Sequence, residues 1–207
     1  MAFLKFIDWL KRLFWKRKVV RLGFYGAPNA GKTSLANRIS MDWLGEPVGK
    51  VSEIPHETRE VQKKEHVIVR SKGRELEMNL LDMPGIATKV DYRDFSAYGM
   101  NKDESLKRAK EATKGVIEAI KWLENVDAAL VVIDSTADPF TQVNITILGN
   151  LEARKIPVII VANKLDSKKA KPDKVKDAFP QHTVVGLSAL TGQNINHLYE
   201  ALAKLSR

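Results

Sequence analysis

The chain has 207 residues and no cysteine, with 44% hydrophobic and 29% charged residues and a net charge of +9 from 34 Lys and Arg against 25 Asp and Glu. This composition is too apolar for an intrinsically disordered protein and indicates one globular domain, or at most two. The lack of cysteine excludes disulfides, thiolate zinc sites and a cysteine nucleophile. No apolar run reaches the roughly 18 residues needed to cross a bilayer, so we expect no transmembrane helix.

The first 21 residues concentrate the positive charge. They hold seven Lys and Arg against one Asp, a net charge of +6, so the other 186 residues carry only +3. Within residues 1–18, large apolar side chains share one face of a predicted helix, and cations share the other. We therefore expect an amphipathic basic helix at 1–18 and a separate domain at 19–207.

Several roles are open for the predicted helix at 1–18. Aromatic side chains opposite Lys and Arg suit a membrane interface, with anionic lipid headgroups as the partner. The alternatives are a helix packed on the following domain, or docking on a partner protein or nucleic acid. Because charges interrupt the apolar stretch, it makes a poor signal peptide. We expect a cytoplasmic location, with the inner face of the cell membrane as a candidate site of peripheral contact.

From residue 19 onward, predicted strands and helices alternate. Apolar segments predict strands at 19–26, 128–134, 156–163 and 182–188, and a hairpin at 60–83 that turns at 71–74. Helices are predicted at 30–40, 103–126, 144–154, 175–179 and 194–205. This alternation, with strands rich in Val, Ile and Leu, indicates an α/β fold with a largely parallel sheet buried on both faces.

Residues 26–33 match the pattern G-x-x-x-x-G-K-[ST] between a predicted strand and a predicted helix, the context that a phosphate-binding loop requires. Glycines let the backbone wrap around phosphate, and the helix amino terminus adds its positive dipole end. We expect Lys32 to reach the β- and γ-phosphates and Thr33 to ligate Mg²⁺. The alternative is a glycine turn with an exposed lysine. The candidate nucleotide-binding residues here are Gly26, Ala27, Pro28, Asn29, Ala30, Gly31, Lys32, Thr33 and Ser34.

A second part of the site is predicted where Asp82 ends an apolar strand and Pro84 and Gly85 follow. A carboxylate at this place can support Mg²⁺, and the Gly85 N–H can meet a γ-phosphate. An Asp before Pro-Gly is, by itself, usually part of a turn. The functional interpretation therefore depends on the neighbouring phosphate loop.

The base-binding residues are predicted after the strands at 156–163 and 182–188. Asp166 can accept two hydrogen bonds from guanine N1–H and its exocyclic amine, whereas adenine offers no such pair of donors. Asn163 can contact the purine N7 edge, and the Ala189 N–H can donate to guanine O6. A polar turn after a core strand is the alternative. The candidate residues are Asn163, Lys164, Asp166, Ser188, Ala189 and Leu190.

Taken in order, GAPNAGKT, Thr58, DMPG, NKLD and SAL resemble the five G motifs of small GTPases. The Pro-Asn pair in the phosphate loop and the segment 57–59 most resemble the Era-like branch of the translation-factor-related GTPases, including short archaeal Era-like proteins without a KH RNA-binding domain. The resemblance implies a three-layer G domain with a six-stranded, mostly parallel sheet and one antiparallel edge strand. It also implies GTP and GDP as ligands and Mg²⁺ as cofactor.

The same resemblance implies two nucleotide-sensitive segments. Thr58 would close over Mg²⁺ and the γ-phosphate in the GTP state and open on hydrolysis. Switch I would be 41–59 and switch II 83–104, and an unknown protein effector would bind through 41–59 and 83–125. Because the chain stops a few residues after its predicted closing helix, we expect no KH domain.

Two residues bear on the expected rate of hydrolysis. Ile86 stands where Ras-like proteins have the glutamine that orients the attacking water, so we expect slow intrinsic hydrolysis. Asn29 stands where the resemblance to potassium-activated GTPases places an asparagine that coordinates K⁺. The alternative for Asn29 is a turn residue with an unusual backbone. The candidate catalytic residues are Asn29, Lys32, Thr58 and Gly85, and the candidate metal ligands are Thr33, Thr58 and Asp82.

The sequence thus predicts a GTPase switch that hydrolyses GTP slowly, with a membrane surface as a candidate place of action. One alternative is a ribosome- or RNA-associated GTPase that acts through the basic terminus, with RNA the less favoured partner. Another is a scaffold that binds GTP without hydrolysing it. Asp166 disfavours ATP as the ligand.

Overall fold

The computed structural model describes residues 19–49, 60–86 and 119–204, together with residues 103, 104, 107, 113, 114 and 117. Six strands form one sheet in the order β2-β3-β1-β4-β5-β6. The strands are β1 Val20–Tyr25, β2 Gln62–Ser71, β3 Arg74–Asp82, β4 Ala128–Asp134, β5 Val158–Asn163 and β6 Thr183–Gly186. Every pair is parallel except β2 with β3. The predicted mostly parallel sheet with one antiparallel edge strand is confirmed.

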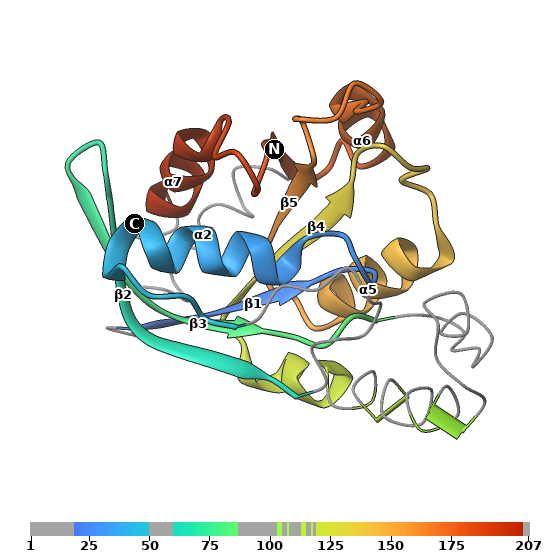
Figure 1. The fold of residues 1–207 in the computed structure, drawn as a ribbon, viewed down its shortest axis with the longest axis horizontal. Coiled ribbons are helices and arrows are strands. Elements are labelled where there is room, and N and C mark those ends of the chain that lie inside the picture. Colours follow the sequence, from blue (N-terminus) through green and yellow to red (C-terminus); the bar gives the residue numbers. More distant parts are fainter. Residues whose placement is uncertain are drawn as a thin grey trace.

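The helices lie on both faces of this sheet and complete three layers (Figure 1). The helices whose bounds the structure gives are α2 Lys32–Leu44, α5 Gln142–Ala153, α6 Pro172–Ala178 and α7 Ile195–Ala203, with a 3₁₀ helix, η1, at Trp122–Asn125. Apolar residues of α2 and α7 share one core with the strands. Residues of η1, α5 and α6 share the other. The expected three-layer α/β domain is therefore confirmed.

Strand β4 shows why the sheet is apolar throughout. Its successive side chains point to opposite faces, so Leu130 and Val132 belong to one core and Val131 and Ile133 to the other. Both faces are covered, and these four side chains are buried. A strand buried on both faces needs a continuous apolar run, as the sequence has here.

Several element bounds differ from those expected. Helix α2 was expected at 30–40, but Gly31 adopts a left-handed backbone with φ 98° before the first helical residue. The helix continues to Leu44, where Gly45 with φ 76° ends it and donates its N–H to the Met41 carbonyl. Helix α6 begins at Pro172, three residues before the predicted start, because proline is well suited to the first turn of a helix.

Some expectations fall on residues that the structure does not describe. The amino-terminal helix at 1–18, Thr58 and residues 87–102 of the predicted switch II lie outside the described residues. The described residues between 103 and 121 are helical, and the chain then tightens into η1. Within the described ranges, no helix is long and apolar enough to cross a membrane.

Candidate functional site

The phosphate loop connects β1 to α2, and two of its glycines are required by close contacts. A Cβ atom on Gly26 would lie 2.3 Å from the Val132 carbonyl oxygen of β4. A Cβ atom on Gly31, whose φ is 98°, would lie 2.2 Å from the Asn163 side-chain nitrogen. No side chain fits at either separation, so the loop lies directly against β4 and the end of β5.

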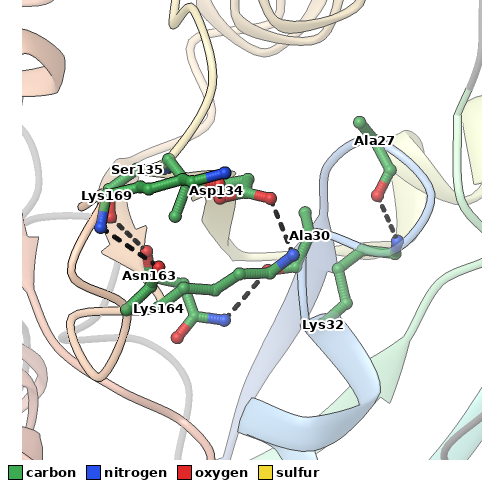
Figure 2. Close-up of polar contacts among 10 residues, drawn as sticks. Ala27, Ala30, Lys32, Asp134, Ser135, Asn163, Lys164 and Lys169 are labelled. Atoms are coloured by element: carbon green, nitrogen blue, oxygen red, sulfur yellow. Dashed lines mark hydrogen bonds and ion pairs between the residues drawn. The ribbon is translucent and has the colours of Figure 1, made fainter. Parts of the chain in front are cut away.

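Lys32 is held inside this loop. Its side chain is almost fully buried, and its Nζ donates to the Ala27 carbonyl oxygen at 2.9 Å (Figure 2). Burial lowers the pKa of Lys32 to about 8, although the nearby Asp82 carboxylate raises it. The loop therefore holds a cation that a polyphosphate would stabilise in its charged form.

Asp82, at the end of β3, is fully buried, and among the described residues only one of its two carboxylate oxygens has a hydrogen-bond partner. One carboxylate oxygen accepts a hydrogen bond from the Thr33 hydroxyl at 2.7 Å. The other is buried with no hydrogen-bond partner among the described residues. Burial raises the pKa of Asp82, against the Thr33 hydrogen bond and the Lys32 charge, which lower it. An unpaired buried oxygen is costly, and a cation or its bound water would satisfy it.

The donor set at Asp82 suits Mg²⁺ better than a metal that needs several protein ligands. Within the described ranges, no group of three or more His, Cys, Asp or Glu residues could hold a metal ion. Mg²⁺ is usually bound by one or two carboxylates together with water and substrate phosphates. The Thr33 hydroxyl and the unpaired Asp82 oxygen therefore fit this ion when a phosphate is bound beside them.

The residues after Asp82 are fixed to the phosphate loop. A Cβ atom on Gly85 would lie 3.0 Å from the Pro28 Cα atom, so the two backbones are in close contact. The Ile86 N–H donates to the Gly26 carbonyl oxygen at 3.2 Å, and the Ile86 side chain is buried in the second core. Ile86 thus serves as an apolar anchor, and its side chain has no atom that could orient water.

Asn29 has a left-handed backbone, with φ 58°. This agrees with the alternative interpretation, in which Asn29 is a turn residue with an unusual backbone. Asparagine adopts this conformation more readily than most residues, so the turn accounts for the residue type without a ligand. A role in K⁺ binding stays a prediction.

The Asn163 side chain joins the phosphate loop to the segment 188–190, which we call the base loop. Its Nδ2 donates to the Ala30 carbonyl oxygen at 2.9 Å (Figure 2). Its Oδ1 accepts from the Ala189 N–H at 2.9 Å. Asn163 is only 3% exposed. The Ala189 N–H, which the sequence predicts to read O6, already has an acceptor in this Oδ1 oxygen. Reading O6 through Ala189 would require that this N–H be shared.

Lys164 and Asp166 follow the end of β5. The Lys164 Nζ forms an ion pair with Asp134 at 2.7 Å, at the end of the adjacent strand (Figure 2). Although burial raises it, hydrogen bonds from Lys164 and Thr136 bring the pKa of Asp134 below its ordinary value. No sequence motif marks Asp134. Its signal was its place at the carboxyl end of β4, in register with Asn163.

The base loop also contacts Asp166. The Ser188 hydroxyl donates to one Asp166 oxygen and accepts from the Thr191 N–H at 3.1 Å. Ser188 is buried, while Leu190 is 74% exposed. The structure thus links the phosphate loop, Asn163, Asp166 and the base loop by direct contacts, and Thr33 links them to Asp82. Thr58 lies outside the described residues, and Ser34 lies in the first turn of α2.

Comparison with known proteins points to the same kind of site. Residues 21–164 match the family described as 50S ribosome-binding GTPase. The chain is 28% identical over 192 residues to the GTPase Der of Thermomicrobium roseum, a match that covers 87% of this chain and 36% of Der. It is 30% identical over 186 residues to the GTPase Era of Clostridium beijerinckii, covering 86% of this chain and 52% of Era. The chain thus spans about half of this Era and about a third of Der.

Two solved structures of Era have a similar fold. An Aquifex aeolicus Era variant bound to GDP·AlF4⁻ has a TM-score of 0.67 and 26% identity. Era in complex with MgGDPNP and nucleotides 1506–1542 of 16S ribosomal RNA has a TM-score of 0.67 and 25% identity. Each match covers 91% of this chain and 57% of the other.

The lowered pKa of Lys32 predicts a pH dependence of GDP binding. Bound phosphate favours the charged amine, so above pH of about 8 the free protein must take up a proton in order to bind. The dissociation constant should therefore rise between pH 7 and 9, at most about tenfold per pH unit. Calorimetry at pH 8.5 in two buffers of different ionisation enthalpy measures the proton uptake.

The matched control is Lys32→Arg, because a guanidinium stays charged over this range. Its affinity for GDP should be nearly independent of pH between 7 and 9, whatever its absolute value. Equal pH dependence in the wild type and the variant would contradict the assignment to Lys32.

Proposed function

Because the chain belongs to the 50S ribosome-binding GTPase family, as an Era-like GTPase domain, we propose that it binds GTP and hydrolyses it to GDP and phosphate with Mg²⁺ as cofactor. One observation carries the proposal: the buried Asp82 carboxylate, held by Thr33 and with one oxygen unpaired, lies in a phosphate loop that buries Lys32. Such a set of buried charges suits a polyphosphate and its cation.

In the proposed reaction, water attacks the γ-phosphorus and the bond to the oxygen that bridges the β- and γ-phosphates breaks. Lys32 would offset negative charge on the β- and γ-phosphates, and the Gly85 N–H would donate to a γ-phosphate oxygen. Thr33 and Asp82 would hold Mg²⁺, which neutralises charge on the phosphates when bound. Thr58 would join them in the GTP state. Because Ile86 cannot orient water, we propose slow intrinsic hydrolysis, as suits a switch.

The base subsite supports guanine as the purine. One Asp166 oxygen accepts from Ser188 and keeps a second lone pair, so the two carboxylate oxygens would together accept from guanine N1–H and its exocyclic amine. The Asn163 amide would contact N7, and Lys164 and Leu190 would flank the base. Asn29 would hold a K⁺ beside the phosphates, where it offsets developing charge much as an arginine does.

The proposal predicts that Asp82→Asn lowers GTP turnover by about 100-fold or more, because the amide is a poor ligand for a cation. GDP binding without Mg²⁺ should change by less than tenfold. Asp138→Asn makes the same chemical change at an exposed position and should leave turnover unchanged. Multiple-turnover phosphate release, measured in K⁺ and in Na⁺, tests these points.

The two cations separate the outcomes of that assay. Faster turnover in K⁺, lost in Asn29→Ala, would support the cation role of Asn29, and equal rates would overturn it. No turnover by the wild type in either cation would overturn hydrolysis and favour a scaffold that only binds GTP. Unchanged turnover in Asp82→Asn would contradict the proposed metal site.

A second candidate function is binding to ribosomal RNA, and a lysine cluster on and before α6 favours it. Residues 167–177 hold five lysines against two aspartates, a net charge of +3, which equals the net charge of the whole chain after residue 21. All five side chains are exposed. These lysines are Lys168, Lys169, Lys171, Lys174 and Lys176. Phosphate groups of a nucleic acid complement such a cluster, and one Era structure holds 16S ribosomal RNA.

Replacing Lys168, Lys169 and Lys174 together by Gln should weaken binding to a fragment of 16S ribosomal RNA, nucleotides 1506–1542. The slope of log affinity against log salt should become shallower by about 2 to 3. The triple replacement of Lys121, Lys155 and Lys204, which are also exposed, removes the same charge elsewhere and should change the slope less. Equal effects of the two variants would overturn a specific role for the cluster.

The predicted helix at 1–18 supports a rival location, at an anionic membrane. A chain that lacks residues 1–18 tests both membrane binding and RNA binding through the basic terminus. Loss of sedimentation with anionic vesicles in that chain would support the membrane proposal. Loss of RNA binding, with the lysine cluster intact, would instead support RNA binding through the basic terminus.

A further inference from the structure

The carbonyl groups of the base loop all have partners. The Ser188 carbonyl accepts from the Gly192 N–H at 2.9 Å. The Leu190 carbonyl accepts from Arg38 Nη2 at 2.7 Å, and the Ala189 carbonyl accepts from Arg38 Nε at a longer 3.4 Å. Arg38 lies in the middle of α2, the helix that begins with the phosphate-binding Lys32. One guanidinium thus contacts two successive peptides of the base loop.

These contacts fix where the N–H groups of the loop point. In a trans peptide, the C=O and the following N–H point in opposite directions. The chain has no cis peptide among the described residues. Because the Ala189 carbonyl faces Arg38, the Leu190 N–H points away from it. The Ala189 N–H likewise points away from Gly192, toward the Asn163 side chain. The Ser188 N–H donates to the Gln193 carbonyl oxygen at 3.0 Å. The Ala189 N–H faces Asn163, and the Leu190 N–H, which points away from Arg38, is the donor of the loop that the Arg38 contact orients.

Arg38 is itself held in place from two elements. Its Nη1 lies 3.9 Å from the Asp42 carboxylate, one helical turn along α2. The other Asp42 oxygen accepts from the Tyr199 hydroxyl of α7 at 2.5 Å. The Tyr199 ring makes an edge contact with Trp43, with centroids 5.5 Å apart. Asp42 of α2 thus contacts the guanidinium directly, and Tyr199 of α7 holds Asp42 in place.

We propose that Arg38 is a positioning residue for base recognition, which orients the peptide between Ala189 and Leu190 so that the Leu190 N–H meets the O6 edge of guanine. This inference rests on the proposed function, since it requires that the site bind a guanine nucleotide. Arg38 does not touch the base. Its effect passes through the Ala189 carbonyl, while its contact with the Leu190 carbonyl holds the next peptide, whose Thr191 N–H donates to the Ser188 hydroxyl.

A ligand change that alters only O6 tests this role. Arg38→Met keeps most of the aliphatic side chain and removes its donors. Affinities are measured for GDP, for 6-thio-GDP, in which a poor acceptor replaces O6, and for IDP, which lacks the exocyclic amine that Asp166 would read. Arg38→Met should weaken GDP and IDP alike, by about tenfold. It should weaken 6-thio-GDP by less than threefold, because that ligand has already lost the contact.

Equal loss for all three ligands would overturn the proposal and leave Arg38 a purely structural role, as would no loss for GDP. Arg38→Lys, which can reach one carbonyl, should recover part of the GDP affinity and of the selectivity for O6. Urea unfolding of each variant shows whether the fold is retained. If the wild type binds GDP and ADP equally well, the proposed guanine site itself fails, a result distinct from any outcome for Arg38.

Discussion

The nucleotide site depends on one buried amide. Asn163 ends β5, and its side chain donates to the phosphate loop at Ala30 and accepts from the base loop at Ala189. The space for it exists only because Gly31 has no side chain. A buried amide of this kind needs each of its partners, so a shift in either loop would leave a polar group unsatisfied. Together with Arg38 of α2, this side chain therefore positions the two halves of the site relative to each other.

Buried charge is the second constraint. The fold buries a lysine amine and a carboxylate close together, and burial lowers the pKa of Lys32 while it raises the pKa of Asp82. Burial thus favours the neutral form of each group. Keeping either group charged lowers the stability of the protein when no ligand is bound. A polyphosphate with a divalent cation would reverse both effects, because it offers a negative charge to the lysine and a positive charge to the carboxylate. The same buried charges that limit stability would then favour binding.

The sequence predicted the sheet and the loops well because both are encoded locally. Strand β4 is a continuous apolar run, and the phosphate loop is a spaced motif, so neither requires knowledge of distant residues. Asp134 and Arg38 were missed because their roles depend on which strand ends and helices become neighbours. The partner of the Ala189 N–H was missed for the same reason. Thr58 and the helix at 1–18 stay predictions, since they lie outside the described residues.

The claim that one amide positions both halves of the site is tested most directly with two ligands. Inorganic pyrophosphate would occupy only the phosphate loop, whereas GDP would occupy both loops. Competition against labelled GDP gives both affinities for the wild type and for Asn163→Ala. We expect the variant to bind both ligands more weakly, with the larger loss for GDP. An unchanged affinity for pyrophosphate would show that Asn163 serves the base alone, and would contradict the account.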